Sequence, residues 1–165
     1  MKLIFASLLA ALLIWPACTT KYYLVRHAER LNDSNDSPLS PIGHARANTL
    51  RDTLANKGID QIFASTFERT QQTGQPLATA LGMAVTVYRP DTTAGLVARL
   101  KKIRGKSVLV VGHSNTVPDL VQGLCGETVA IPDDDFDNLF IVTIRRAWGR
   151  TTTNLVKTTY GPASP

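Results

Sequence analysis

Short β-rich segments alternate with helical segments along most of this chain, and this alternation limits the possible folds most strongly. The strand candidates are residues 21–26, 61–64, 85–88, 107–111, 138–145 and 151–158. The helix candidates are residues 41–57, 68–81, 95–104 and 118–124. Strands separated by helices form a sheet that is covered on both faces. We therefore predict an α/β fold, a three-layer α/β/α sandwich with a mostly parallel central sheet.

The length and composition are those of one globular domain. The chain has 165 residues, of which 44% are hydrophobic and 19% charged, a composition that excludes a disordered polypeptide. No internal repeat and no second linker interrupts it. We predict two parts: residues 1–18 as a signal peptide ending in a lipobox-like cysteine, and residues 19–165 as the folded domain.

The first 18 residues have the pattern of an export signal. Lys2 precedes an apolar run from residue 3 to residue 15, which is shorter than the roughly 20 residues of a membrane-spanning helix. Ala17-Cys18 resembles the end of a bacterial lipobox, in which the cysteine thiol is acylated, although Trp15 departs from that pattern. The resemblance implies that the protein is exported and that a lipid on Cys18 anchors it to a membrane. It would then be a periplasmic or outer-membrane lipoprotein of the bacterial cell envelope.

Two alternatives for this segment remain open, ordinary secretion and an uncleaved anchor. In the lipoprotein interpretation, Thr19 and Thr20 form a short tether. Cys125 is then the one free cysteine of the mature domain, so no internal disulfide can form.

The charge of the chain suits a small anionic substrate better than a nucleic acid. The formal net charge is +5, and Lys2 accounts for one of these charges. Nucleic-acid binding requires basic residues clustered near stacking aromatic residues, whereas here the basic residues are scattered along the sequence.

Three polar segments follow predicted strands. They are Arg26-His27-Ala28-Glu29, the segment 65–73 (STFERTQQT), and Gly112-His113-Ser114-Asn115-Thr116. Open α/β sheets bind ligands at the carboxyl ends of their strands, so we expect these segments to meet at one edge.

The residue types in these segments favour phosphoryl chemistry. Arg26 precedes His27, and Arg69 lies in the first turn of a predicted helix, where the helix dipole also favours an anion. Guanidinium groups bind phosphate oxygens in a bidentate manner, and a neutral imidazole between them can attack phosphorus. The chain contains no P-loop motif, no Gly-x-Ser-x-Gly elbow and no His-Glu-x-x-His motif.

The three segments, in this order, resemble the histidine phosphatase (phosphoglycerate mutase-like) superfamily, in its compact phosphatase branch. The stretch 38–43 (PLSPIG) between them matches the family's turn into its first helix, and the likeness runs from about residue 22 to residue 140. The resemblance implies a phosphohydrolase that acts on a small phosphomonoester or on phosphohistidine, without a metal or another cofactor.

The resemblance also implies roles for individual residues. His27 would be the nucleophile that becomes a phosphohistidine, and three partners would hold the phosphoryl group: Arg26, Arg69 and His113. Asn115 is a candidate for substrate contact, with a structural role in the turn as the alternative. Glu29 matches an acidic position that is more often structural than catalytic.

The chain departs from the family pattern at the general acid. Residues 81–106 contain no glutamate, where the mutase branch places its acid, and Asp91 is the only acidic residue there. Ser114 occupies the position at which the acid phosphatase branch has an aspartate. Asp91 is thus a possible general acid, and a glycolytic mutase is disfavoured. The alternative functions are a degenerate module that binds phosphorylated ligands without turnover, and a metal site at the two histidines.

Overall fold

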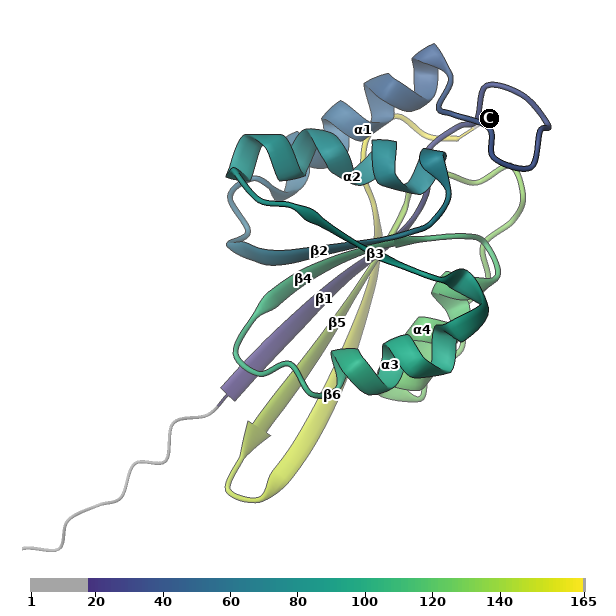
Figure 1. Ribbon diagram of the computed structural model, residues 1–165. Coiled ribbons are helices and arrows are strands. Elements are labelled where there is room, and N and C mark those ends of the chain that lie inside the picture. The colour runs from purple at the N-terminus through teal and green to yellow at the C-terminus, as the bar shows by residue number, and fades with distance from the viewer. Residues whose placement is uncertain (1–17, 165) are drawn as a thin grey trace, which may run out of the picture.

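The computed structural model describes residues 18–164, which form one six-stranded sheet with helices on both faces (Figure 1). The strands are β1 (Cys18–Arg26), β2 (Ile59–Ser65), β3 (Val85–Tyr88), β4 (Ser107–Gly112), β5 (Asn138–Ala147) and β6 (Arg150–Thr159). The α-helices are α1 (Pro41–Leu54), α2 (Glu68–Leu81), α3 (Thr93–Leu100) and α4 (Thr116–Cys125), and a 3-10 turn, η1 (Pro90–Thr92), precedes α3.

The strand order is β3-β2-β4-β1-β5-β6. The strands β3, β2, β4 and β1 run parallel, and β5 and β6 add an antiparallel edge. The carboxyl ends of the parallel strands therefore meet at one edge, as the sequence predicts. The prediction of a three-layer sandwich with a mostly parallel sheet is confirmed.

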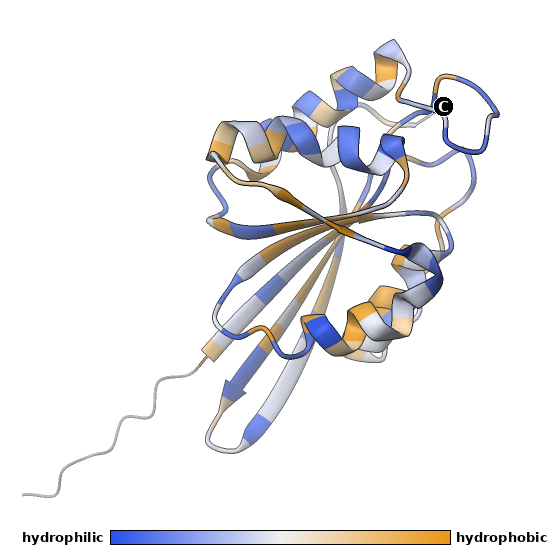
Figure 2. Ribbon diagram, viewed as in Figure 1, coloured by the Kyte–Doolittle hydropathy of each residue, from blue (hydrophilic) through white to orange (hydrophobic). Residues whose placement is uncertain are grey.

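Alternate side chains of the central strands fill two separate cores. Leu24 and Val110 pack in the core beneath α3 and α4, whereas Val25 and Val111 pack in the core beneath α1 and α2. A central strand buried on both faces is a continuous apolar run, which is the pattern of residues 22–25 in β1 and residues 108–111 in β4. Figure 2 shows this run as hydrophobic colour along the middle of the sheet.

Local signals set the ends of two helices as the sequence predicts. The Ser40 hydroxyl accepts a hydrogen bond from the Gly43 N–H at 3.1 Å and caps α1, with Pro41 in the first turn. Gly43 also lets α1 approach the segment that follows β1 closely, because a Cβ at this position would collide with the Glu29 carbonyl oxygen. Gly82, at φ 64°, ends α2.

Several predicted boundaries are wrong. The helix predicted over residues 41–57 ends at Leu54, the helix predicted over 95–104 spans Thr93–Leu100, and the last helix begins at Thr116 rather than residue 118. Thr19 and Thr20 are not a tether, because β1 begins at Cys18 and pairs with β5 from Cys18 to Val25.

The predicted signal peptide falls mostly on residues 1–17, outside the described residues. Among residues 18–164, no helix has the length and apolar character needed to cross a bilayer.

Candidate active site

A cavity of about 680 Å³ opens at the carboxyl edge of the parallel strands. Its lining includes every residue predicted for the catalytic and substrate-binding roles: Arg26, His27, Arg69, Asp91, His113 and Asn115. The other lining residues are Arg30, Phe67, Pro90, Ser114, Thr116, Asp133 and Phe136. The fold thus brings together three segments that lie up to about 90 residues apart in the sequence.

His27 follows the last residue of β1 and is 4% exposed. Its Nδ1 lies 2.7 Å from the Ala28 carbonyl oxygen. Because a carbonyl can only accept, Nδ1 carries the proton in the neutral ring and Nε2 carries the lone pair. The pKa of His27 is lowered to about 3, mainly by burial; the bond to Ala28 opposes this shift, and the nearby His113, Arg26 and Arg69 add to it. His27 is therefore a neutral imidazole with a free Nε2 at neutral pH.

His113 follows β4 and lies beside His27, with 5.3 Å between the ring centroids. Its Nε2 is 2.8 Å from the Ser65 hydroxyl oxygen, which lies 2.9 Å from the Thr70 hydroxyl oxygen. The Ser65 hydroxyl can donate to the imidazole or accept from it, so rotation of this hydroxyl accommodates either tautomer of His113. Burial is the main cause that lowers the pKa of His113 to about 4.

Arg26 is held by a loop rather than by an acid. Its Nη1 donates to the carbonyl oxygens of Pro132 at 2.9 Å, Asp133 at 2.8 Å and Asp135 at 3.1 Å. Its guanidinium carbon lies 4.2 Å from the centre of the Phe136 ring. Its Nε is buried and has no hydrogen-bond partner among the described residues. The loop fixes one edge of the guanidinium and leaves a donor unused.

Arg69 has a similar arrangement on the other side of the cavity. Its Nη1 donates to the Asn35 carbonyl oxygen at 2.9 Å, and its guanidinium carbon lies 4.4 Å from the centre of the Phe67 ring. Its Nε is also buried without a partner in residues 18–164. No carboxylate of that range forms an ion pair with Arg26 or Arg69. Two uncompensated cations with free, buried donors make this a site for an anion.

Threonines of the segment 65–73 position the segment that contains His27. The Thr73 hydroxyl accepts a hydrogen bond from the Ala28 N–H at 3.0 Å and donates to the Arg69 carbonyl oxygen at 2.7 Å. It thereby links the backbone next to His27 with the backbone of Arg69. The spacing Ser-x-x-x-x-Thr-x-x-Thr in residues 65–73 is explained by these contacts with His113 and Ala28.

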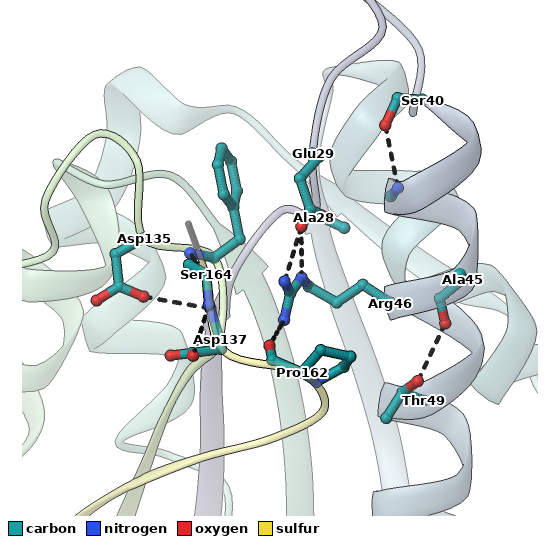
Figure 3. Close-up of polar contacts among 12 residues, drawn as sticks. Ala28, Glu29, Ser40, Ala45, Arg46, Thr49, Asp135, Asp137, Pro162 and Ser164 are labelled. Carbon is teal, nitrogen blue, oxygen red and sulfur yellow. Dashed lines mark hydrogen bonds and ion pairs between the residues drawn. The ribbon is translucent and has the colours of Figure 1, made fainter.

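Glu29 is structural. Its carboxylate pairs with Arg46 of α1 at 2.8 Å, the Arg46 side chain is 4% exposed, and Glu29 does not line the cavity (Figure 3). Arg46 also donates to the Pro162 carbonyl oxygen at 2.9 Å. This pair ties the end of β1, the first helix and the C-terminal tail together.

The C-terminal tail in turn holds the loop that binds Arg26. The Ser164 hydroxyl accepts a hydrogen bond from the Phe136 N–H at 2.8 Å, and the Ser164 N–H donates to the Asp137 carboxylate at 3.1 Å. Figure 3 shows Asp137 beside Asp135. The sequence suggests that residues 133–135 form a solvated loop. In the structure, backbone carbonyl oxygens of this loop accept hydrogen bonds from Arg26. The importance of Phe67, Phe136 and this loop was not evident in the sequence, because carbonyl groups and ring faces have no motif.

The remaining candidate residues lie as follows. Asp91 lines the cavity from η1, where its carboxylate is paired with Arg89 at 3.0 Å on an exposed surface. Cys18 lies at the opposite end of β1 from the cavity, and His44 is exposed on α1. Among the described residues, no group of three potential metal ligands is close enough to hold a metal ion.

The two lowered pKa values predict an acid-sensitive fold. A histidine in the unfolded chain has a pKa near 6.5 and binds a proton below this pH. In the folded protein, His27 and His113 bind a proton only near pH 3 and pH 4. Stability should therefore fall as the pH drops below about 6.5. Between pH 7.5 and pH 4.5, the free energy of unfolding should fall by about 2–3 kcal/mol less in His27→Asn than in the wild type. Urea unfolding at both pH values measures this difference.

The control is His44→Asn, because His44 is exposed on α1. It should keep the wild-type difference between pH 7.5 and pH 4.5. An equal acid sensitivity of His27→Asn and His44→Asn would show that His27 is not held neutral.

Sequence comparison relates part of the chain to a known family. The model of the histidine phosphatase superfamily (branch 1) matches residues 22–90, a segment that contains His27 and Arg69 but ends before His113. A "probable phosphoglycerate mutase GpmB" of Yersinia pestis is 39% identical over 70 residues, which cover 38% of this chain and 33% of that protein. The chain thus matches about a third of the length of these curated relatives.

Structural comparison extends the likeness over the domain. The protein histidine phosphatase SixA, solved with tungstate, superposes with a TM-score of 0.62 at 24% identity, covering 84% of this chain and 96% of that one. A phosphoserine phosphatase mutant of Entamoeba histolytica, solved with phosphoserine, superposes with a TM-score of 0.60 at 15% identity, covering 86% and 96%. At such identities the likeness establishes a shared fold.

Proposed function

The chain belongs to the histidine phosphatase superfamily, and from this premise we propose that it is a phosphohydrolase whose nucleophile is His27. The observation that carries the proposal is the pair of guanidinium groups, Arg26 and Arg69, each with a buried Nε that has no partner in residues 18–164. They flank an imidazole whose Nε2 holds a lone pair.

The proposed reaction has two steps. In the first, Nε2 of His27 attacks phosphorus, the bond from phosphorus to the leaving oxygen of a phosphomonoester or the leaving nitrogen of a phosphohistidine breaks, and a phosphohistidine forms on His27. Arg26, Arg69 and His113 bind the equatorial oxygens, where negative charge is spread in the transition state. The Nδ1–H bond to the Ala28 carbonyl stabilises the positive charge that the ring acquires. In the second step, water attacks phosphorus in line and releases phosphate and the neutral histidine.

The substrate in this proposal is a small phosphomonoester or a phosphohistidine, with Asn115 as a candidate contact on the rim. Three arginines (Arg26, Arg30 and Arg69) and two acidic residues (Asp91 and Asp133) line the cavity, and this excess of positive charge suits a compact anion. A glycolytic mutase is disfavoured because residues 81–106 contain no glutamate.

Turnover of p-nitrophenyl phosphate with excess chelator tests the proposal. We expect hydrolysis without a metal, and rapid quenching should trap radioactive phosphate on the protein, labile in acid and stable in base, as expected for phosphohistidine. A protein that tungstate stabilises against heat but that hydrolyses none of a panel of phosphomonoesters and phosphohistidine would be the degenerate binding module. Activity that the chelator abolishes would instead assign the two histidines to a metal.

Asp91 is proposed as the donor of the leaving-group proton. An alkoxide is a strong base that needs this proton in the transition state, whereas nitrophenolate scarcely does. Asp91→Asn should reduce the hydrolysis of alkyl phosphates by about 10²-fold and change that of p-nitrophenyl phosphate little.

The control for Asp91→Asn is Arg89→Gln, because Arg89 is its ion-pair partner on an exposed surface. This change should affect both substrate classes equally and weakly. Equal sensitivity of the two classes to Asp91→Asn would mean that Asp91 only shapes the turn before α3.

We further propose that residues 1–17 direct export and that a lipid on Cys18 anchors the protein to the bacterial cell envelope. Cys18→Ser should leave the domain folded but move it from the membrane to the soluble fraction, in membranes washed with about 0.5 M salt to remove electrostatic binding. Fractionation with an antibody measures this. Wild-type protein found wholly soluble after export would contradict the lipid anchor.

A further inference from the structure

Seven basic residues gather at the end of the sheet opposite the cavity. This basal surface consists of Cys18, the α3–β4 connection (residues 101–106) and the β5–β6 hairpin tip (residues 145–150). Its basic residues are Lys101, Lys102, Arg104, Lys106, Arg145, Arg146 and Arg150. The two segments contain no acidic residue. The basic residues are scattered along the sequence, but the fold brings these seven to one end of the sheet.

Backbone pairing and hydrogen bonds hold the parts of this surface together. Cys18 pairs with Arg146 across β1 and β5, and the Arg146 Nη2 donates to the Lys101 carbonyl oxygen at 3.4 Å. The Gly105 N–H donates to the Thr20 hydroxyl at 3.1 Å. Figure 1 shows the start of β1, the end of α3 and the hairpin tip at the same end of the molecule.

The charge of the basal surface is almost uncompensated. Only Lys106 has an acidic partner among the described residues, Asp60 at 2.9 Å. Lys101, Lys102, Arg104, Arg145 and Arg150 are exposed. Figure 2 shows hydrophilic colour on the hairpin and at the end of α3. Such a field attracts an extended anionic surface.

A large aromatic side chain stands at the tip of the same hairpin. Trp148 is 71% exposed and lies at φ 54°, in a two-residue turn with Gly149 at φ 71°. Such turns favour asparagine or glycine, so the turn does not require a tryptophan. The exposed side chain does not pack in the core either. Tryptophan is enriched at the boundary between lipid headgroups and acyl chains.

We propose that the basal surface docks on an anionic phospholipid bilayer, with Trp148 inserted among the headgroups. The apolar residues 3–15 join the domain at Cys18, so either those residues or a lipid on Cys18 would bring this surface to a membrane. Each lysine or arginine near an anionic membrane strengthens binding by about fivefold.

The orientation of the docked domain also narrows the class of substrate, an inference that rests on the proposed function. The nine residues of β1 span about 26 Å, so the cavity lies about that far from the bilayer. A site at that height faces the aqueous phase. The substrate would be a water-soluble phosphorylated molecule or protein, not the headgroup of a lipid in the same membrane.

Vesicle sedimentation of the full chain tests docking without any assay of activity, so that its failure and failure of the proposed enzyme are distinguishable. The probes are vesicles of phosphatidylcholine, with and without about 30% phosphatidylglycerol, at low and at high salt. The wild type should bind the anionic vesicles at least tenfold more tightly, and high salt should remove this preference.

Charge reversal identifies the surface. Lys102→Glu/Arg150→Glu should reduce the preference for anionic vesicles to about twofold or less, as should the second variant, Lys101→Glu/Lys102→Glu. The matched control is Arg30→Glu/Lys157→Glu, which changes the net charge equally: Arg30 lines the cavity, and Lys157 lies in β6 away from the hairpin tip. The control should keep most of the preference. Thermal unfolding establishes that each variant is folded.

The tryptophan supplies a second readout. In a Trp15→Phe background, Trp148 is the only tryptophan, and brominated lipids should quench its fluorescence in anionic vesicles. Equal binding to both vesicle types, equal loss in the control variant, or an unquenched Trp148 would overturn the proposal. Tighter binding to a duplex oligonucleotide than to the anionic vesicles would also overturn it and assign the surface to nucleic acid.

Discussion

His27→Asn should lower kcat for every substrate by at least about 10⁴-fold and abolish the trapped phosphoenzyme. Asparagine has about the volume of the imidazole but no nucleophilic nitrogen, because the lone pair of its amide nitrogen is delocalised. The two guanidinium groups and His113 remain, so the variant should still bind tungstate or phosphate. The expected combination is lost turnover with a retained rise in melting temperature on anion addition.

The control for this substitution is again His44→Asn, on the exposed face of α1. It should retain wild-type kcat, which shows that loss of an imidazole as such is harmless. More than about 1% residual turnover in His27→Asn would indicate that water attacks phosphorus directly, with His27 only positioning the substrate. A variant that loses anion binding together with turnover would indicate a disrupted site instead.

The sequence predicts the layers and the position of the site because both depend on local patterns. Apolar runs identify the strands, and polar residues directly after β1 and β4 place His27 and His113 at the same edge. The range of α2, residues 68–81, is predicted correctly because glycine marks its end. The range of α3 is not, because a 3-10 turn at Pro90–Thr92 starts the helical conformation early and no glycine or proline stops it at Leu100.

The electrostatics of the site depend on contacts that no motif records. Arg26 is oriented by three backbone carbonyls of residues 132–135, more than 100 residues away. The low pKa values of His27 and His113 follow from burial, which depends on how the loops close over the strand ends. Clustering of the basal surface likewise appears only after β1, β4 and β5 pair.

Arg69→Ala should reduce kcat/KM by about 10²–10³-fold, the effect of removing one preorganised donor to the charge of a transition state. Arg69 is half-buried at the start of α2, and its guanidinium donates to the Asn35 carbonyl oxygen. Because a helix start at the cavity edge tolerates truncation, the melting temperature should fall far less than after a core truncation. Anion binding, read as the stabilisation by tungstate, should weaken in parallel with kcat/KM.

Arg69→Lys separates charge from geometry. Lysine keeps the positive charge, but it is a single ammonium group that cannot hold the Asn35 carbonyl and a phosphoryl oxygen in the fixed fork of a guanidinium. Its activity should therefore lie between those of the wild type and Arg69→Ala. Arg51→Ala, which removes a partly exposed arginine paired with Asp52 on α1, is the control and should leave kcat/KM unchanged. If Arg69→Lys were as active as the wild type, Arg69 would act only through its charge, and the free Nε donor would not be part of the phosphoryl site.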